Sequence, residues 1–189
     1  MDAQRHAQLV SIIRERGLRS FDEPVALASG ELSRDFIDGK AALARGADLE
    51  LACRAMLDSL EGIEFDAVGG LTMGADQFAH GMAMLAGCRW FVVRKEPKGR
   101  GTRKLVEGAE LEQGVRVALV EDVVTTGGSI LKALEAVEQL GAQVVAAVAL
   151  VDRGESAAPE FERRGIPYLP VVTYRDLDIR PVGLAAGKL

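Results

Sequence analysis

Two spacings of hydrophobic residues alternate along the chain, and together they predict its architecture. Continuous apolar runs, typical of buried strands, occur at VRVALVE (115–121) and AQVVAAVALVD (142–152). Between them, GSILKALEAVEQLG (128–141) places its apolar residues on one face of a helix. Buried strands that alternate with amphipathic helices indicate a parallel sheet covered on both faces. The pattern therefore predicts the α/β fold class, with a central parallel sheet flanked by helices.

The same alternation continues on either side of this unit and gives the order of the remaining elements. It predicts helices at 48–60, 75–87 and 157–165 and strands at 65–71, 89–94 and 166–172. No internal repeat, low-complexity tract or linker interrupts the series. One domain spanning residues 1–189 is therefore expected.

The N-terminal part has a different pattern. Residues 2–16 carry their apolar side chains on one side of a helical wheel, which predicts a helix that caps the domain. After it, PVALASGELSRDFIDG (24–39) has two short apolar stretches on either side of Ser29-Gly30. This arrangement favours a β-hairpin.

Residues 117–130, VALVEDVVTTGGSI, combine an apolar run, two adjacent acids and a glycine-rich turn. If the strand ends at Val120, Glu121 and Asp122 stand at its carboxyl end, where open α/β sheets form their ligand crevice. The turn Thr125–Ser129 then leads into a helix whose first N–H groups are unpaired and favour an anion such as phosphate. Because like charges repel, the acids are expected to hold hydroxyl groups, or to position a divalent ion, on the part of the ligand beside the phosphate. A sugar phosphate satisfies both demands; the alternative is a pair of solvated charges before an ordinary helix N-cap.

A second glycine-rich turn, GGLTMGAD (69–76), has glycines at P-loop spacing but lacks the Lys-Ser/Thr that a P-loop needs. No GxGxxG occurs either, so neither a P-loop nor a Rossmann dinucleotide site is expected. The turn offers N–H groups to a second phosphate, or it is a tight connection from strand to helix.

Cations gather after the strand 89–94, in a loop (95–104) whose glycines and proline disfavour a helix. A mobile basic loop suits a ligand with several phosphates and can exclude water when it closes; the alternative is a solvated surface loop. Arg153, at the end of the strand 142–152, can pair with a planar acidic substrate or form a strand-end ion pair. The cations of the loop region are Arg94, Lys95, Lys98, Arg100, Arg103 and Lys104.

Composition limits the partners. Lys and Arg number 23 against 28 Asp and Glu, and the net charge of −5 disfavours a mainly electrostatic nucleic-acid or membrane binder. Cys53 and Cys88 have no metal-binding spacing, and no signal-peptide core or run of 18 apolar residues occurs. A cytoplasmic protein without nucleic-acid or membrane partners is expected.

Four of these features, in this order, resemble type I phosphoribosyltransferases and, among them, the orotate phosphoribosyltransferase family. LASGELSRDFID (27–38) resembles the N-terminal hairpin of that family, and RKEPKGRG (94–101) resembles its flexible catalytic loop. VALVEDVVTTGGS (117–129) resembles the motif that binds 5-phosphoribosyl 1-diphosphate (PRPP), and Arg153 falls where the family has an orotate-contacting arginine. The resemblance covers about residues 18–175, and four ordered matches are more specific than one.

The resemblance implies a fold, a reaction and roles for the matched residues. The fold is the type I phosphoribosyltransferase fold, with residues 1–45 as a small N-terminal hood and residues 46–175 as the core sheet. The reaction transfers the phosphoribosyl group of PRPP to orotate in pyrimidine biosynthesis.

Glu121 and Asp122 would hold the ribose hydroxyls, and Thr125–Ser129 the 5-phosphate. Magnesium would be carried by the diphosphate and the ribose hydroxyls without a direct protein ligand, and in a homodimer the catalytic loop would be shared across the interface. The implied PRPP-binding residues are Arg94, Lys95, Lys98, Arg100, Glu121, Asp122, Val123, Val124, Thr125, Thr126, Gly127, Gly128 and Ser129; the implied catalytic residues are Lys98, Arg100 and Asp122, and the implied orotate contacts are Thr125 and Arg153.

Three positions depart from the family pattern. Met73 and Ala28 stand where many members have lysine, and Arg100 stands where a histidine is usual. Arginine keeps the charge but cannot donate a proton near neutral pH. Two alternatives follow: transfer to another nucleobase, or a non-catalytic PRPP-sensing regulator that binds nucleic acid or a protein. A regulator would not need the cationic loop and should carry a basic face.

Overall fold

The computed structural model describes residues 2–27, 30–97 and 104–183. In these residues, six strands form a central sheet in the order β5-β4-β3-β6-β7-β8. Neighbouring strands are parallel, except that β5 runs antiparallel to β4. The predicted parallel sheet is confirmed, whereas the short edge strand β5 was not predicted. The strands are β3 (Ala67–Leu71), β4 (Arg89–Val93), β5 (Val106–Gly108), β6 (Arg116–Val124), β7 (Gln143–Asp152) and β8 (Tyr168–Thr173).

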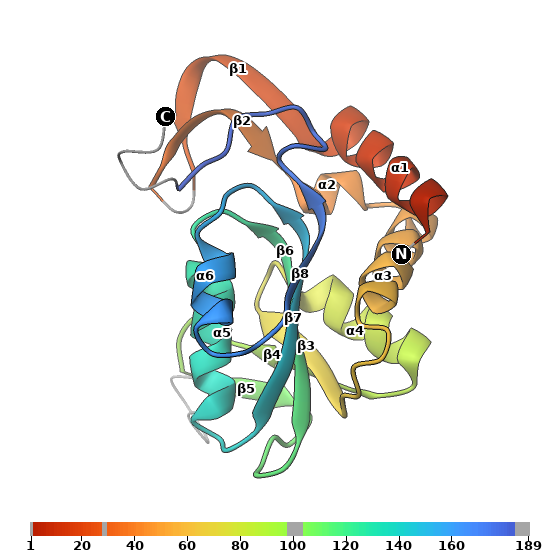
Figure 1. Cartoon of the computed structure of the whole chain (residues 1–189), viewed down its shortest axis with the longest axis vertical. Coiled ribbons are helices and arrows are strands. Elements are labelled where there is room, and N and C mark those ends of the chain that lie inside the picture. The colour runs from red at the N-terminus through yellow and green to blue at the C-terminus, as the bar shows by residue number, and fades with distance from the viewer. Residues whose placement is uncertain (1, 28–29, 98–103, 184–189) are drawn as a thin grey trace.

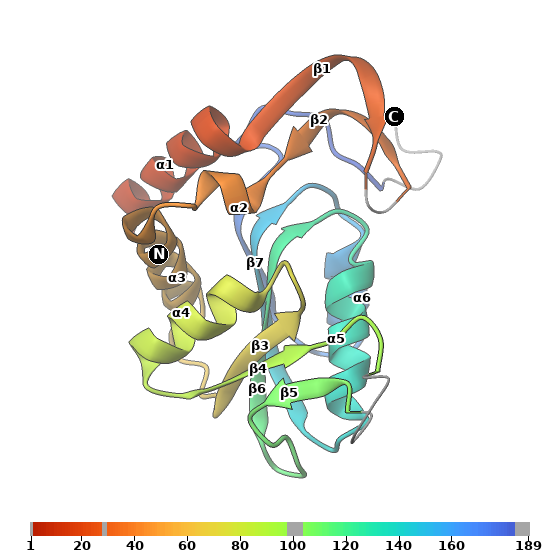
Figure 2. The same cartoon turned by 180° about the vertical axis from the view of Figure 1, so that it is seen from behind.

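Helices cover both faces of the sheet (Figure 1, Figure 2). They are α3 (Gly46–Ser59) and α4 (Asp76–Ala86) on one face and α5 (Gly128–Glu138) and α6 (Ala157–Glu162) on the other. In β6, Ala118 and Val120 pack in the cluster that contains α3 and α4, while Val117 and Leu119 pack in the cluster that contains α5. Successive side chains of a strand point to opposite faces, so a sheet that is covered on both sides needs continuous apolar strands. None of the helices in the described part of the chain has the length and apolar character needed to span a membrane.

The N-terminal residues form a further layer at one end of the sheet. Its elements are α1 (Ala3–Ile12), a π-helical turn (Ile13–Gly17), the antiparallel hairpin β1 (Leu18–Ala26) and β2 (Leu32–Ile37), and the short helix α2 (Gly39–Ala42). The hairpin lies over the end of the sheet at which β6 and β7 finish (Figure 1). The predicted hairpin is confirmed, but the α-helix predicted over 2–16 ends at Ile12. Gly17 leaves room for α2, because a Cβ there would lie 2.9 Å from Ala42 Cβ.

β6 is longer than the sequence predicted. The expected strand ended at Val120 or Glu121, whereas β6 continues to Val124. The reason is backbone pairing with β7, in which Glu121 is opposite Ala149 and Val123 is opposite Val151. Glu121 and Asp122 therefore lie inside the strand, near its carboxyl end, and not in the loop after it.

Gly69 and Gly70 lie inside β3, not in the turn that follows it. A Cβ at Gly69 would lie 2.1 Å from the backbone oxygen of Phe91, and a Cβ at Gly70 would lie 2.1 Å from that of Val120. Phe91 and Val120 belong to the neighbouring strands β4 and β6, so glycine is required for this close approach. For these two glycines the observed role is close packing between strands, which was not predicted, and the offer of N–H groups to a second phosphate stays a prediction for the turn itself.

Candidate active site

A cavity of about 510 Å³ lies at the carboxyl ends of β3, β6 and β7. Residues 121–129 of β6 and the following turn form part of its wall, together with the turn 71–74 after β3. Lys95 and Arg153 also line it, so most of the predicted PRPP and orotate contacts are brought to one place. The hairpin region and α2 contribute Leu27, Phe36, Ile37 and Lys40 to the wall, and α5 adds Ile130.

The acid pair Glu121–Asp122 is almost completely buried, with 4% and 9% of the two residues exposed. Asp122 Oδ1 accepts the N–H of Val123 at 2.7 Å, and Glu121 Oε1 accepts the N–H of Asp122 at 3.2 Å. Glu121 Oε2 is buried and has no hydrogen-bond partner in the described part of the chain. Burial, reinforced by the charge of Asp122, raises the pKa of Glu121 to about 9. The alternative of solvated strand-end charges is therefore wrong, and an oxygen held out of water is left for a hydroxyl donor.

The turn after β6 is compact and begins α5 without a side-chain cap. Gly127, the residue before the helix, has φ +84°, and a Cβ there would lie 3.0 Å from Ala157 Cβ. Gly128 and Ser129, the first residues of α5, line the cavity. The N–H groups at the start of a helix favour an anion, so this part of the wall suits a phosphate group.

Gly74 lets the turn after β3 approach the acid pair. A Cβ at Gly74 would lie 2.3 Å from Glu121 Oε1 and 2.5 Å from Asp122 Oδ1. These distances are far below ordinary contact, so glycine is required at this position for the observed carboxyl geometry. The turn after β3 therefore packs directly against the carboxyl groups of Glu121 and Asp122.

Arg153 is 1% exposed and connects the end of β7 to the hairpin. Its Nη1 donates to the backbone oxygen of Asp35 at 2.7 Å, and its Nη2 donates to Ser33 Oγ at 3.0 Å. Asp152 Oδ1 instead accepts the N–H of Gly154, so the predicted alternative of an ion pair at the strand end is not what holds Arg153. The Nε of Arg153 is buried without a partner in the described residues, and it is a donor left for a ligand.

Of the predicted loop cations, Lys95 lies on the cavity wall, and its backbone oxygen accepts Lys132 Nζ at 2.6 Å. Arg94 follows β4, where its Nη1 lies 3.9 Å from Glu107 Oε1, and its predicted contact with the diphosphate stays a prediction. Lys98, Arg100 and Arg103 lie outside the described residues, as does Ala28 of the hairpin.

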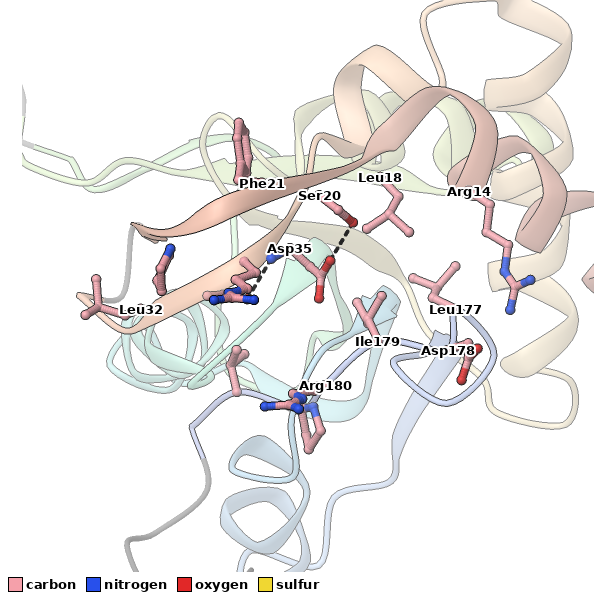
Figure 3. Close-up of a pocket in the computed structure, with 15 residues that line it drawn as sticks. Arg14, Leu18, Ser20, Phe21, Leu32, Asp35, Leu177, Asp178, Ile179 and Arg180 are labelled. Carbon is pink, nitrogen blue, oxygen red and sulfur yellow. Dashed lines mark hydrogen bonds between the residues drawn. The ribbon is translucent and has the colours of Figure 1, made fainter.

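A second, larger cavity of about 840 Å³ lies between the hairpin and residues 177–182 (Figure 3). Ser20 Oγ donates to Asp35 Oδ1 at 2.7 Å along its wall. None of the predicted site residues lines this cavity. The smaller cavity, which holds the acid pair and the glycine-rich turn, is therefore the candidate active site.

Two wall residues illustrate what the sequence motifs missed. Lys40 Nζ lies 3.2 Å from Asp122 Oδ2, although the two residues are 82 positions apart in the chain. Lys40 follows the hairpin without any recognisable motif, so no local signal reveals this contact. Phe36 also lines the cavity with 39% of its surface exposed, and its place in the hairpin stretch LASGELSRDFID is the sequence signal that contains it.

Comparison with known proteins supplies the family. The phosphoribosyl transferase domain family matches residues 42–164. An orotate phosphoribosyltransferase from Aquifex aeolicus is 42% identical over 166 residues, which cover 85% of this chain and 90% of that protein. One from Streptomyces coelicolor is 44% identical over 151 residues, which cover 77% of this chain and 82% of that protein. The crystal structure of Mycobacterium tuberculosis orotate phosphoribosyltransferase in complex with PRPP is 33% identical, with a TM-score of 0.76, and the match covers 93% of this chain and 99% of that one.

The domain match spans the strands and turns that build the cavity, and it makes the molecule a phosphoribosyltransferase with the type I fold that the motifs predicted. Within that class, the relatives from A. aeolicus and S. coelicolor each match this chain over most of its length. The chain belongs to the orotate phosphoribosyltransferase family. The resemblance drawn from the sequence is thereby confirmed.

Proposed function

We propose that the protein transfers the 5-phosphoribosyl group of PRPP to orotate, giving orotidine 5′-phosphate and diphosphate in pyrimidine biosynthesis. The observation that carries the proposal is the position of the buried pair Glu121–Asp122 beside the turn Thr125–Ser129 on one cavity wall. A ligand that is half sugar and half phosphate satisfies both groups, because its hydroxyls donate to the carboxyl oxygens and its phosphate accepts from the turn. The relative from M. tuberculosis, solved in complex with PRPP, supports this choice of ligand.

The reaction exchanges one bond at the anomeric carbon of the ribose. A ring nitrogen of orotate forms the new C–N bond with inversion, the C–O bond to diphosphate breaks, and the proton of that nitrogen passes to solvent. Positive charge develops on the ribose ring and negative charge on the leaving group. Asp122, beside the ribose, stabilises the former, and the loop cations Lys95, Lys98 and Arg100 stabilise the latter.

Arg153 and Thr125 would select the base. Both residues line the cavity. The unpaired Nε of Arg153 supplies a charged donor for an acidic base, and the hairpin fixes the guanidinium through Asp35 and Ser33. A charged donor held in one orientation favours orotate, which carries a carboxylate, over a neutral base.

Magnesium fits as an ion that the substrate carries. Within the described residues, no group of three His, Cys, Asp or Glu side chains could hold a metal. The diphosphate and the ribose hydroxyls would supply its oxygen ligands, and the bound ion would add positive charge at the leaving group. The chain itself contributes Glu121 and Asp122, which hold the hydroxyls, and the loop cations.

The proposal includes a cytoplasmic homodimer. Cys53 and Cys88 are free thiols, which suits a reducing compartment. As the family resemblance implies, the loop that carries Lys98 and Arg100 would reach into the cavity of the partner subunit.

Lys98→Ala is expected to lower kcat about tenfold or more and to leave the melting temperature within about 1 °C, because the lost charge acts on the leaving diphosphate and not on the fold. Steady-state kinetics and thermal unfolding measure the two effects. Unchanged turnover in the variant would count against a catalytic loop.

The decisive experiment follows the absorbance of orotate in the presence of purified protein, PRPP and magnesium. Consumption of orotate is expected, and unchanged absorbance would refute the proposal. A panel of other bases in the same assay tests the second candidate, transfer to another nucleobase. That candidate is favoured by Met73, an uncharged residue on the cavity wall with 69% of its surface exposed, at a position where lysine is common in the family.

A further inference from the structure

Lys40 connects the N-terminal layer to the acid pair. It lies on α2, and its Nζ is 3.2 Å from Asp122 Oδ2. Its side chain is 54% exposed and lines the same cavity as the glycine-rich turn. We propose that Lys40 is a positioning residue for PRPP: it holds Asp122 in the orientation that receives the ribose hydroxyls, and it offsets the negative charge of the acid pair before the ligand binds. The inference rests on the proposed function only in taking PRPP as the ligand.

The backbone that carries Lys40 is fixed on both sides. Asp38 Oδ1 accepts the N–H of Ala41 at 3.0 Å, and the N–H of Asp38 donates to the backbone oxygen of Gly17 at 2.9 Å. On the side of the sheet, Gly39 packs against the acid strand, since a Cβ there would lie 3.5 Å from Asp122 Cβ. Because the backbone is held, Lys40 reaches Asp122 from a defined base, and only its side-chain torsions remain free.

The charges around the acid pair explain why a cation is needed here. Two adjacent carboxyl groups are buried, and the charge of Lys40 lowers the pKa of Glu121 against the larger, opposite effects of burial and of Asp122. Arg153 is committed to the hairpin through its two Nη atoms. Among the described residues, Lys40 is the cation that forms an ion pair with either acid. In the described part of the chain, the other titratable or charged groups near the pair include Tyr168 on β8, which interacts in turn with Asp152, and Lys95 and Arg153 on the cavity wall.

Two consequences distinguish this role from a structural one. If Lys40 orients and neutralises Asp122, its loss weakens the binding of PRPP without the base being present. Its loss also raises the pKa of Glu121 further, because the charge of Lys40 lowers that pKa, so the acidic limb of PRPP binding moves to higher pH. A residue that only stabilised α2 would lower the fraction of folded protein and would leave affinity and pH profile unchanged.

The test measures PRPP binding with magnesium, in the absence of base, by isothermal titration calorimetry from about pH 7 to about pH 10.5, a range that includes the Glu121 pKa of about 9. Lys40→Met is expected to weaken binding about tenfold and to move the acidic limb to higher pH, whereas Lys40→Arg restores both to within about threefold of the wild type. Lys40→Gln, which keeps a donor but not the charge, is expected to behave like Lys40→Met. The control is Arg54→Met, which removes a comparably exposed cation (50%) from its ion pair with Glu50 on α3 and should change neither quantity.

Folding of each variant is checked by its thermal transition, and Lys40→Gln carries the test if Lys40→Met does not fold. Wild-type affinity and an unmoved pH profile in a folded Lys40→Met or Lys40→Gln protein would overturn the inference. If the wild type binds PRPP but leaves orotate unchanged, the proposed base is wrong while weaker binding in the Lys40 variants still supports the inference. If the wild type does not bind PRPP, both proposals fall.

Discussion

Glu121→Gln is expected to lower kcat/KM for PRPP by about 10²-fold to 10³-fold while making the empty protein more stable at alkaline pH. The loss of turnover follows from the charge that Glu121 gains when it gives up its proton on binding the ribose hydroxyls, because an amide accepts a weaker hydrogen bond from a hydroxyl than a carboxylate does. The gain in stability follows from burial, which raises the pKa of Glu121 from an ordinary value of 4.5 to about 9. Glu121 is thus expected to increase turnover while it lowers the stability of the ligand-free protein.

The sign of the pH effect is fixed by the two pKa values. Between pH 4.5 and pH 9 the folded protein holds the Glu121 proton and the unfolded chain does not, so raising the pH lowers the free energy of unfolding of the wild type. Glutamine removes this dependence. The stability of the variant relative to the wild type should therefore increase as the pH rises through this window, by at most about 1.4 kcal/mol per pH unit. Asp152, whose raised pKa does not depend on Glu121, is present in both proteins and largely cancels in the difference.

Urea unfolding at pH 6, 7, 8 and 9 measures this difference, with activity measured on the same samples. Glu112→Gln is the matched control, because Glu112 is exposed in the turn before β6. It should follow the wild type in both respects. A stability difference between Glu121→Gln and the wild type that does not vary with pH would show that Glu121 is ionised in the empty site.

The parts of the fold that the sequence predicted are those set by local pattern. Continuous apolar runs gave the central strands, and one-sided apolar spacing gave the helices, because a sheet buried on both faces imposes these patterns directly. The length of β6 could not be read in this way. Its last residues include Glu121 and Asp122, and they stay in the strand because their backbone pairs with β7. A charged residue ends an apolar run without ending a hydrogen-bonded strand.

The residues of the candidate site also fall into those that local sequence predicted and those that only the fold brings together. Glu121 to Ser129 are contiguous, so their chemistry could be argued from one stretch of sequence, and the structure places them on one cavity wall. Lys40 and Gly74 come from distant segments, and each acquires its meaning only where the fold brings it against the acid pair. Lys40 carries no chemical pattern of its own, and the glycine-rich turn that contains Gly74 predicted a phosphate site or a tight connection, not a contact with the acids. Residues that position others are therefore the ones that sequence motifs miss.

Gly74→Ala is expected to lower kcat/KM by about 10²-fold or more while the protein still folds. The added Cβ would lie 2.3 Å from Glu121 Oε1 and 2.5 Å from Asp122 Oδ1, so both carboxyl groups must move by roughly 1 Å to reach ordinary contact, and a misplacement of this size at a reacting centre costs about that factor. Side-chain ends can shift, whereas backbone cannot. Gly70→Ala, which would place a Cβ 2.1 Å from the backbone oxygen of Val120, is therefore expected to unfold the protein.

Steady-state kinetics with PRPP and orotate, together with thermal unfolding, distinguish these outcomes. Gly46→Ala is the matched control, because nothing lies within 4 Å of a Cβ at that position, and it should keep wild-type turnover and stability. Full activity in a folded Gly74→Ala protein would mean that the carboxyl geometry at the end of β6 does not determine the rate. Loss of activity with a preserved thermal transition would instead show that Gly74 is needed for the position of the Glu121 and Asp122 carboxyl groups. Gly70→Ala is the contrasting case, because the same methyl group there clashes with backbone and is expected to unfold the protein.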